Sequence, residues 1–412
     1  MIDIIPSTDR RRVERLLAPR RVDDAGLDRR VARIVGDVRR GGDAALRRYA
    51  ARFDALAGPI EVEPDEVARG AASVAPAVRA AIRAAARNIL RVAKAQVPTS
   101  VRVRVSPGVT VEQRVRPLDR VGCYVPGGRY PLPSSLLMTA LPARAAGVPE
   151  IVAVCPRPDA AVLAAAQAAG VSRLFRVGGA HAVAALAYGT ATIPRVDKIV
   201  GPGNAYVAAA KTLVQRDCAI DFQAGPSEIL VLSERGNPAW VAADLIAQAE
   251  HDPDARAVLV TSKARLARAV AREVARAMPA DGPARAAIRA NGGIIVTRTP
   301  AEAIALANRM APEHLVVDDE GQAAAVGAAG AIFIGGTTAQ VAGDYAIGSN
   351  HVLPTGAAAR FRGGLSAADF VRVVSVQRVT RRGLETLAPT VTTLARAEGL
   401  LAHARSVEVR LS

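Results

Sequence analysis

Four of the five histidines in this sequence stand near carboxylate or carboxamide residues that could share a metal ion or a proton with them. His251 follows Gln248 by three positions in an expected helix, which puts both side chains on one face. A single histidine is more often a structural residue with its hydrogen bonds made than a metal ligand. The spacing does not show which of these histidines lie close together in the fold. The pattern therefore indicates a metal or proton-transfer site without fixing its members. The other pairs are Glu313 with His314, Asp344 with His351, and Glu398 with His403; the fifth histidine is His181.

Clusters of glycine follow several expected strands, where backbone could approach a phosphate closely. They lie at 125–128, 178–180 and 201–204, and the last one ends in Asn204. No G-x-G-x-x-G sequence follows a strand. Plain tight turns explain the glycines equally well, so a dinucleotide would bind an incomplete or variant Rossmann unit.

The elements that must position these residues alternate along most of the chain. Helices are expected at 27–53 and 63–96, followed by a hairpin in which valines alternate around 106–108. Short apolar strands then alternate with helices, which indicates parallel sheets covered by helices and an α/β fold. The expected strands are 150–155, 174–178, 229–232, 257–260, 293–297 and 331–335, and the expected helices are 158–169, 204–214, 238–250, 262–277 and 300–310. Alternation fades beyond about 360, and a final helix is expected near 390–402.

Composition limits the classes of function. The formal net charge of +16 raises the possibility of nucleic-acid binding. However, the arginines are spread along helices such as 10–48 rather than gathered in one tract, which favours solvated helix faces. Aromatic residues make up only 3%, so the core must consist of Ala, Val, Leu and Ile.

The remaining sequence signals point to a soluble cytoplasmic protein. Cys123, Cys155 and Cys218 have no metal-binding spacing and are expected to be buried thiols in a reducing compartment. The first residues lack the order of a signal peptide, and no apolar run approaches the roughly 18 residues of a membrane span.

Long stretches throughout the chain resemble the histidinol dehydrogenase family. Any one of them could arise by chance, but the set in this order is highly specific. They are GCYVPGG at 122–128, DKIVGPGN at 197–204, AGPSE at 224–228, QAEH at 248–251, APEHL at 311–315, GDY at 343–345, NHVLPT at 350–355, and EGL at 398–400 followed by His403.

The resemblance implies a role for each matching residue. One zinc ion per subunit would be bound by Gln248, His251, Asp344 and His403, a donor set that suits zinc. Glu313 and His314 would be the catalytic pair. Substrate contacts would come from Ser227, His351 and Glu398 together with His314 and the four zinc ligands, and dinucleotide contacts from Tyr124, His181 and Asn204.

The implied reaction is a four-electron oxidation of L-histidinol through L-histidinal to L-histidine by two NAD⁺ in turn, in the last steps of histidine biosynthesis. His314 would take the alcohol proton as hydride leaves, and Glu313 would then activate water to attack the aldehyde. Zinc would serve as a template that holds the amino alcohol.

The resemblance also implies two incomplete Rossmann-like domains and a homodimer. Residues 1–24 would form an N-terminal arm, residues 25–123 and 233–365 the domain with the metal and catalytic residues, and 124–232 the dinucleotide domain. Residues 366–412 would cross to the other subunit, where Glu398 and His403 complete the partner's site. Neither nucleic acid nor a membrane is an expected partner.

Two positions depart from the family pattern. His181 stands where members usually have Gln, and Arg129-Tyr130 follows the double glycine in place of smaller residues or Lys. Neutral drift at the edge of a cofactor site accounts for both. The alternative is a related zinc and NAD-dependent enzyme for another polar alcohol, such as a sulfonated diol, whose anion an added Arg would pair.

Overall fold

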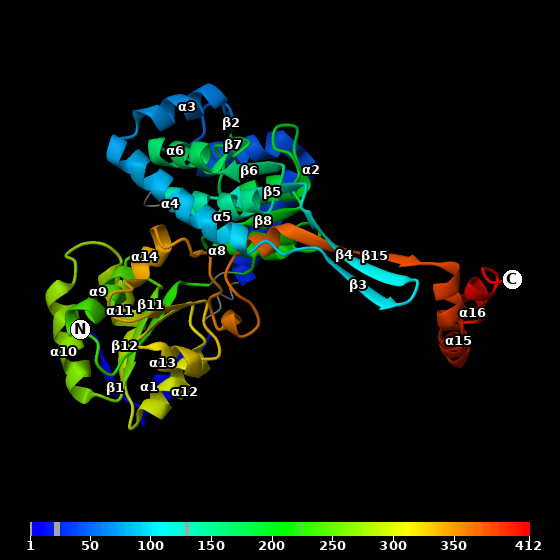
Figure 1. Cartoon of the computed structure of the whole chain (residues 1–412). Coiled ribbons are helices and arrows are strands. Elements are labelled where there is room, and N and C mark those ends of the chain that lie inside the picture. The colour runs from blue at the N-terminus through cyan, green and yellow to red at the C-terminus, as the bar shows by residue number, and fades with distance from the viewer. Residues whose placement is uncertain (1, 20–24, 128–131, 224) are drawn as a thin grey trace.

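The computed structural model of the protein describes residues 2–19, 25–127, 132–223 and 225–412. The strands in these ranges form two six-stranded sheets and a separate three-stranded sheet. Helices cover both faces of each larger sheet, so the expected α/β class is confirmed (Figure 1). No helix in these ranges is long and apolar enough to cross a bilayer.

The first sheet has the order β2-β7-β6-β5-β8-β9 and is parallel except at its edge strand β2. Its strands are short apolar runs, as expected where helices cover both faces. The strands are β2 (Glu61–Val62), β5 (Arg120–Tyr124), β6 (Glu150–Val154), β7 (Arg173–Phe175), β8 (Lys198–Val200) and β9 (Ala219–Ile220), and the helices are α2 (Ala25–Phe53), α3 (Pro64–Ser73), α4 (Pro76–Ala95), α5 (Pro133–Ala145), α6 (Ala160–Ala169), α7 (Gly179–Tyr188) and α8 (Ala205–Val214).

The second sheet has the order β1-β12-β11-β10-β13-β14 and is parallel throughout. Every residue of its central strands β10 and β11 is buried. The strands are β1 (Ile4–Pro6), β10 (Glu228–Leu232), β11 (Arg256–Thr261), β12 (Gly292–Val296), β13 (His314–Val317) and β14 (Ala331–Ile334), and the helices are α1 (Arg10–Leu17), α9 (Pro238–Ala249), α10 (Ala264–Ala277), α11 (Ala284–Asn291), α12 (Pro300–Met310), α13 (Glu320–Ala325) and α14 (Gln340–Tyr345).

Both sheets share one topology. In each, the chain runs outward from a central strand over two neighbours and then returns to the other side of that strand. The switch point lies between β5 and β8 in the first sheet and between β10 and β13 in the second. Ligands of open parallel sheets bind at the carboxyl ends of the strands at such a point, so each sheet offers one candidate crevice.

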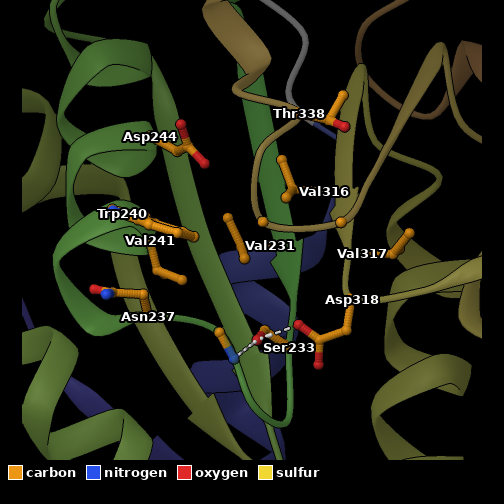
Figure 2. Close-up of a pocket in the computed structure, with 13 residues that line it drawn as sticks. Val231, Ser233, Asn237, Trp240, Val241, Asp244, Val316, Val317, Asp318 and Thr338 are labelled. Carbon is orange, nitrogen blue, oxygen red and sulfur yellow. Dashed lines mark hydrogen bonds between the residues drawn. The ribbon is translucent and has the colours of Figure 1, made fainter.

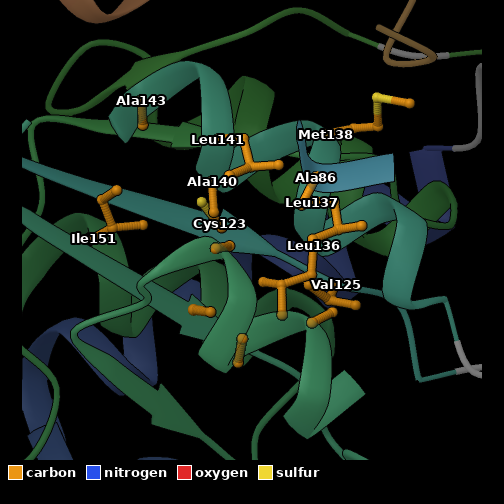
Figure 3. Packing of buried hydrophobic residues seen from close by; sticks show 14 of the residues in the cluster. Ala86, Cys123, Val125, Leu136, Leu137, Met138, Ala140, Leu141, Ala143 and Ile151 are labelled. Atoms are coloured by element: carbon orange, nitrogen blue, oxygen red, sulfur yellow. The ribbon is translucent and has the colours of Figure 1, made fainter. Parts of the chain in front are cut away.

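Small aliphatic side chains build the cores, as the low aromatic content predicts. Figure 3 shows the packing of α4 and α5 against the first sheet, where Leu136, Met138 and Leu141 are at most 1% exposed. Burial of each such side chain contributes about 1.5–3 kcal/mol. Cys123 lies in the same cluster, and all three cysteines are buried free thiols, as predicted.

A three-stranded antiparallel arm extends from the two larger sheets and carries the C-terminal helices at its far end (Figure 1). The predicted hairpin is confirmed as β3 (Val101–Ser106) and β4 (Val109–Pro117). A third strand that the sequence analysis did not predict, β15 (Val371–Val379), pairs with β4 along its whole length. It leads into α15 (Arg381–Ala397) and α16 (Leu401–Glu408).

Two expected helices have different bounds in the structure. Residues 63–96 form two helices, because Pro76 forces the preceding Ala75 out of the helical region and starts α4. The expected final helix at 390–402 is also two helices, which are separated at Gly399 by a φ of 75°.

The packing of the first helices differs from the predicted division of the chain. Residues 25–123 were expected to lie with the metal and catalytic residues, but α2, α3 and α4 pack on α7, α6 and α5 of the first sheet. The apolar stripe of each helix is buried there. The N-terminal residues likewise form no free arm in their described part, since β1 pairs with β12 of the second sheet.

Candidate active site

Glu313 and His314 lie at the amino end of β13, beside the first residue of β10. Ala311 ends α12 in a left-handed conformation with φ 46°, and Pro312 then directs the chain into β13. Adjacent residues of an extended strand point to opposite faces. Glu313 precedes the strand, however, and both side chains reach the same neighbour, Glu228, whose N–H donates to Glu313 Oε2 at 2.7 Å and whose carbonyl lies 3.2 Å from His314 Nδ1.

Helix α9 adds Gln248 to this pair through Ser227. The Gln248 amide donates to Ser227 Oγ, and that hydroxyl donates to Glu313 Oε2 at 2.7 Å. Gln248 is fully buried, and its Oε1 has no hydrogen-bond partner among the described residues. A buried carbonyl oxygen without a partner is costly, so Oε1 is an oxygen available to a cation or a ligand. His251 lies on the turn just beyond α9 and is exposed.

Helix α14 brings Asp344 to the other side of His314. The Gln340 amide donates to Asp344 Oδ2 at 3.0 Å, while Asp344 Oδ1 lies 3.8 Å from His314 Nε2. The main-chain oxygen of Asp344 lies 3.1 Å from His351 Nδ1. Buried His314 Nε2 has no hydrogen-bond partner among the described residues, and Asp344 Oδ1 is the carboxylate oxygen beside it.

The two sheets are tied together at the segment that carries His351. Pro142 inside α5 lacks an N–H, which leaves the carbonyl of Met138 without its helical partner. The side chain of Asn350 donates to that carbonyl at 2.7 Å. The position of His351 therefore depends on both sheets.

The pKa shifts favour a positive charge on His314 and a negative charge on Asp344. Burial disfavours the imidazolium of His314, but the carboxylates of Glu313 and Asp344 outweigh it and raise the pKa of His314 to about 10. Burial also opposes ionisation of Asp344, yet the adjacent His314, with His351 and His251, lowers its pKa below the ordinary value. The pKa of His351 is lowered because it is buried.

The donor atoms of this centre suit zinc only in part within one chain. Oxygen and imidazole nitrogen are zinc ligands, and the unpartnered Gln248 Oε1 and the carboxylate of Asp344 fit that role. Across the described residues, no three His, Cys, Asp or Glu side chains gather closely enough to hold a metal ion. Figure 1 shows that helices α15 and α16 lie at the far end of the arm, away from α9 and α14. Glu398 is the C-cap of α15 and His403 lies in α16, so neither is near the other predicted ligands of the same chain.

Two of the three predicted dinucleotide residues, Tyr124 and Asn204, end or follow the strands that border the switch point of the first sheet. The Gly179 N–H donates to Tyr124 Oη at 2.9 Å, and Asn204 caps α8 at the carboxyl end of β8. His181 is buried, and its Nε2 lies 2.8 Å from Oδ2 of Asp54. Asp54 also accepts the N–H of Gly178. The sequence analysis missed Asp54 because it lies at the end of α2, far from the glycine stretch in sequence. Arg129 and Tyr130 lie outside the described residues.

A second missed feature fixes the loop before Asn204. Gly201 has φ 118°, and a Cβ there would come within 2.2 Å of the Tyr124 carbonyl oxygen. Its N–H donates to Asp221 at 2.7 Å, and Lys211 donates to its carbonyl at 3.0 Å. Lys211 and Asp221 form an ion pair and are both almost fully buried. Both the N–H and the carbonyl of Gly201 are therefore hydrogen-bonded to side chains, which keeps the loop in one conformation.

In the equivalent crevice of the second sheet, a carboxylate of the protein already accepts the backbone N–H groups. The crevice lies at the carboxyl ends of β10 and β13 beside Trp240, as Figure 2 shows. The carboxylate of Asp318 accepts the Ser233 hydroxyl at 2.7 Å and the N–H groups of residues 234 and 235. Backbone N–H groups of this kind bind phosphate in such crevices. The geometry therefore favours the first sheet as the dinucleotide side.

Comparisons with known proteins show the family of the chain. The family model for histidinol dehydrogenase matches residues 18–411. Histidinol dehydrogenase from Methylococcus capsulatus is 47% identical over 97% of this chain and 95% of its own length, and the one from Methanothermobacter thermautotrophicus is 44% identical over both full lengths. The crystal structure of histidinol dehydrogenase from Elizabethkingia anophelis has a TM-score of 0.93 at 34% identity and covers 100% of this chain and 98% of that one. This chain belongs to the histidinol dehydrogenase family.

Proposed function

We propose that the protein is a zinc enzyme that oxidises L-histidinol through L-histidinal to L-histidine, with one water molecule and two NAD⁺ consumed. The observation that carries the proposal is the buried acid–base pair Glu313 and His314, set between Gln248 and Asp344. Buried free cysteines suit the reducing cytoplasm, where we place the enzyme.

The proposed zinc ligands are Gln248, His251 and Asp344 of one subunit and His403 of another. Zinc, when bound, would supply a Lewis-acid centre that holds the nitrogen atoms of the substrate and offsets the negative charge at Asp344. Ser227, His351 and Glu398 are the proposed further contacts to the substrate, and Tyr124, His181 and Asn204 those to NAD⁺.

Proton transfers in the proposed reaction fall to two side chains. Asp344 is one of the two carboxylates that raise the pKa of His314, so a zinc ion that offsets its charge would lower that pKa and let His314 act as a base through Nε2, which has no hydrogen-bond partner among the described residues. His314 takes the hydroxyl proton while the carbon-bound hydrogen leaves as hydride to the nicotinamide. Glu313 then takes a proton from the water that attacks the aldehyde, and the resulting hydrate gives the second hydride to a second NAD⁺.

The position of Glu398 and His403 makes a homodimer part of the proposal. Both lie on the arm, and His403 is exposed there. An arm that reaches a second copy would bring these side chains to the partner's centre. The exposed valines Val101, Val103 and Val373 on the arm supply apolar surface for such a contact.

The departure at His181 gives no support to a different substrate. This side chain is buried against Asp54 and packs against Tyr49 and Phe53, so it has structural partners within the first sheet's unit. Ser227, Gln248 and Asp344, which lie around Glu313 and His314, all belong to stretches that resemble the family.

The proposed activity is tested by NADH release from histidinol, with a small panel of sulfonated diols assayed beside it. Activity with histidinol should disappear on chelation and return with zinc. Turnover of a diol without turnover of histidinol would refute the proposed substrate.

Mixed dimers test the role of the arm. His251→Ala and His403→Ala should each be inactive alone. When they are co-expressed in equal amounts, half of the dimers pair unlike subunits, and each of those has one intact centre. About a quarter of wild-type activity should therefore return, whereas an arm that serves its own subunit would restore none.

A further inference from the structure

A buried ion pair lies directly beside the proposed catalytic residues. Glu228 and Arg256 are the first residues of β10 and β11 and are partners in the parallel register. Arg256 Nη1 lies 3.7 Å from Glu228 Oε2, and the two residues are 2–3% exposed. Neither belongs to the proposed zinc ligands or substrate contacts.

The main chain of Glu228 contacts both members of the catalytic pair. Its N–H donates to the carboxylate of Glu313 at 2.7 Å. Its carbonyl lies 3.2 Å from Nδ1 of His314 and can accept only if that nitrogen carries the proton. Such a contact selects the tautomer whose Nε2 has the lone pair. One residue thus orients the water-activating base and fixes which nitrogen of His314 acts as the other base.

The side chains of the pair hold this main chain in place from two directions. Glu228 Oε1 accepts the N–H of Gly356 at 3.1 Å, which anchors the segment that follows His351. Arg256 donates its backbone N–H to the Ser227 carbonyl at 2.9 Å and its guanidinium to the Ala18 carbonyl at 2.8 Å. A shift of either side chain would move the peptide that contacts Glu313.

We infer that the Glu228–Arg256 pair is a positioning element for Glu313 and His314, an inference that rests on the proposed function. The pair acts through geometry, because the contacts to Glu313 and His314 come from the main chain of Glu228 that the pair holds in place. Removal of one partner leaves an uncompensated buried charge, which the structure relieves by moving. Replacement of both partners by neutral side chains of similar volume removes that cause of movement.

The test compares Glu228→Gln, Arg256→Met and the double variant in single-turnover NADH bursts, started from histidinol and from supplied histidinal. Each single variant should lower the burst rate constant of both half-reactions by a similar factor of about 10 to 100, the usual effect of a displacement near 1 Å. Zinc content and KM for NAD⁺ should not change. The double variant should recover to within about threefold of wild type.

The burst rate constant separates positioning from stability. Partial unfolding reduces the fraction of active enzyme and therefore the burst amplitude, while a misplaced pair reduces the rate constant. Arg173→Met, which breaks the partly exposed Arg173–Glu61 pair at the edge of the first sheet, is the matched control and should leave both rate constants unchanged. Single variants with wild-type rate constants, or a double variant as slow as the product of the two, would overturn the inference. A wild-type enzyme without activity on histidinol would instead overturn the proposed function on which this inference rests.

Discussion

Replacement of Glu313 by Gln should separate the two oxidations of the proposed reaction. The carboxylate accepts two hydrogen bonds through Oε2, from Ser227 and from the N–H of Glu228. The amide oxygen of Gln can accept both, so the side chain should keep its place. What it loses is the capacity to take a proton from water. The step that uses water should therefore suffer, while the removal of the alcohol proton by His314 should not.

The expected magnitude follows from the loss of one general base. Oxidation of supplied histidinal should slow by roughly 10²- to 10⁴-fold, which corresponds to about 3–5 kcal/mol in the barrier. The first hydride transfer from histidinol should slow by less than about tenfold. Zinc content should stay at the wild-type level, because Glu313 is not among the proposed ligands.

The assay is stopped-flow NADH absorbance under single-turnover conditions, with histidinol and histidinal as separate substrates. His314→Asn is the companion variant and should depress the alcohol step at least as much as the aldehyde step. Equal slowing of both steps by Glu313→Gln, or slowing of neither, would refute the division of labour and leave Glu313 as a structural partner of Ser227.

Further substitutions test other parts of the structure. His251→Ala or Asp344→Ala should remove tightly bound zinc and activity together, as measured by metal analysis after dialysis; a zinc-loaded, active variant would contradict the ligand set. Gly201→Ala should raise KM for NAD⁺ or prevent folding, since its Cβ would meet the Tyr124 carbonyl; unchanged kinetics would contradict the held loop. Burial, opposed by Arg256, raises the pKa of Glu228 from 4.5 to about 7, which corresponds to roughly 3 kcal/mol. The folded state thus binds the extra proton, so the stability of the wild type should fall as pH rises from 4.5 to 7 and that of Glu228→Gln should fall less; parallel denaturation curves would contradict this.

The sequence predicts elements that have a clear alternation, apolar run or helix cap better than elements that lack one. The hairpin of β3 and β4 shows plain alternation, and helix α9 begins at Pro238 after its Asn237 cap, as expected. Helices α5 and α7 were not predicted, because they are buried on nearly all sides and therefore lack a polar face and a clear period. Strand β13 was not predicted either.

The candidate site was predicted by motif resemblance rather than by spacing. The structure brings Ser227, Gln248, Glu313, His314, Asp344 and His351 together, although they are spread over more than a hundred residues. Partners such as Asp54 and Arg256 join residues from distant parts of the chain. Their contacts follow from strand register and helix packing, which no local pattern in the sequence records.

The arm has a consequence for how the chain avoids aggregation. Strand β3 is an outer strand of its sheet, and Val101, Val103 and Val105 are each more than half exposed. An open strand edge with exposed valines is a template for pairing with any other extended chain. Arg102 and Arg104 alternate with those valines, and charged side chains on an edge discourage such pairing. On this strand the two arginines therefore oppose aggregation, a physical role for part of the basic composition that does not involve nucleic acid.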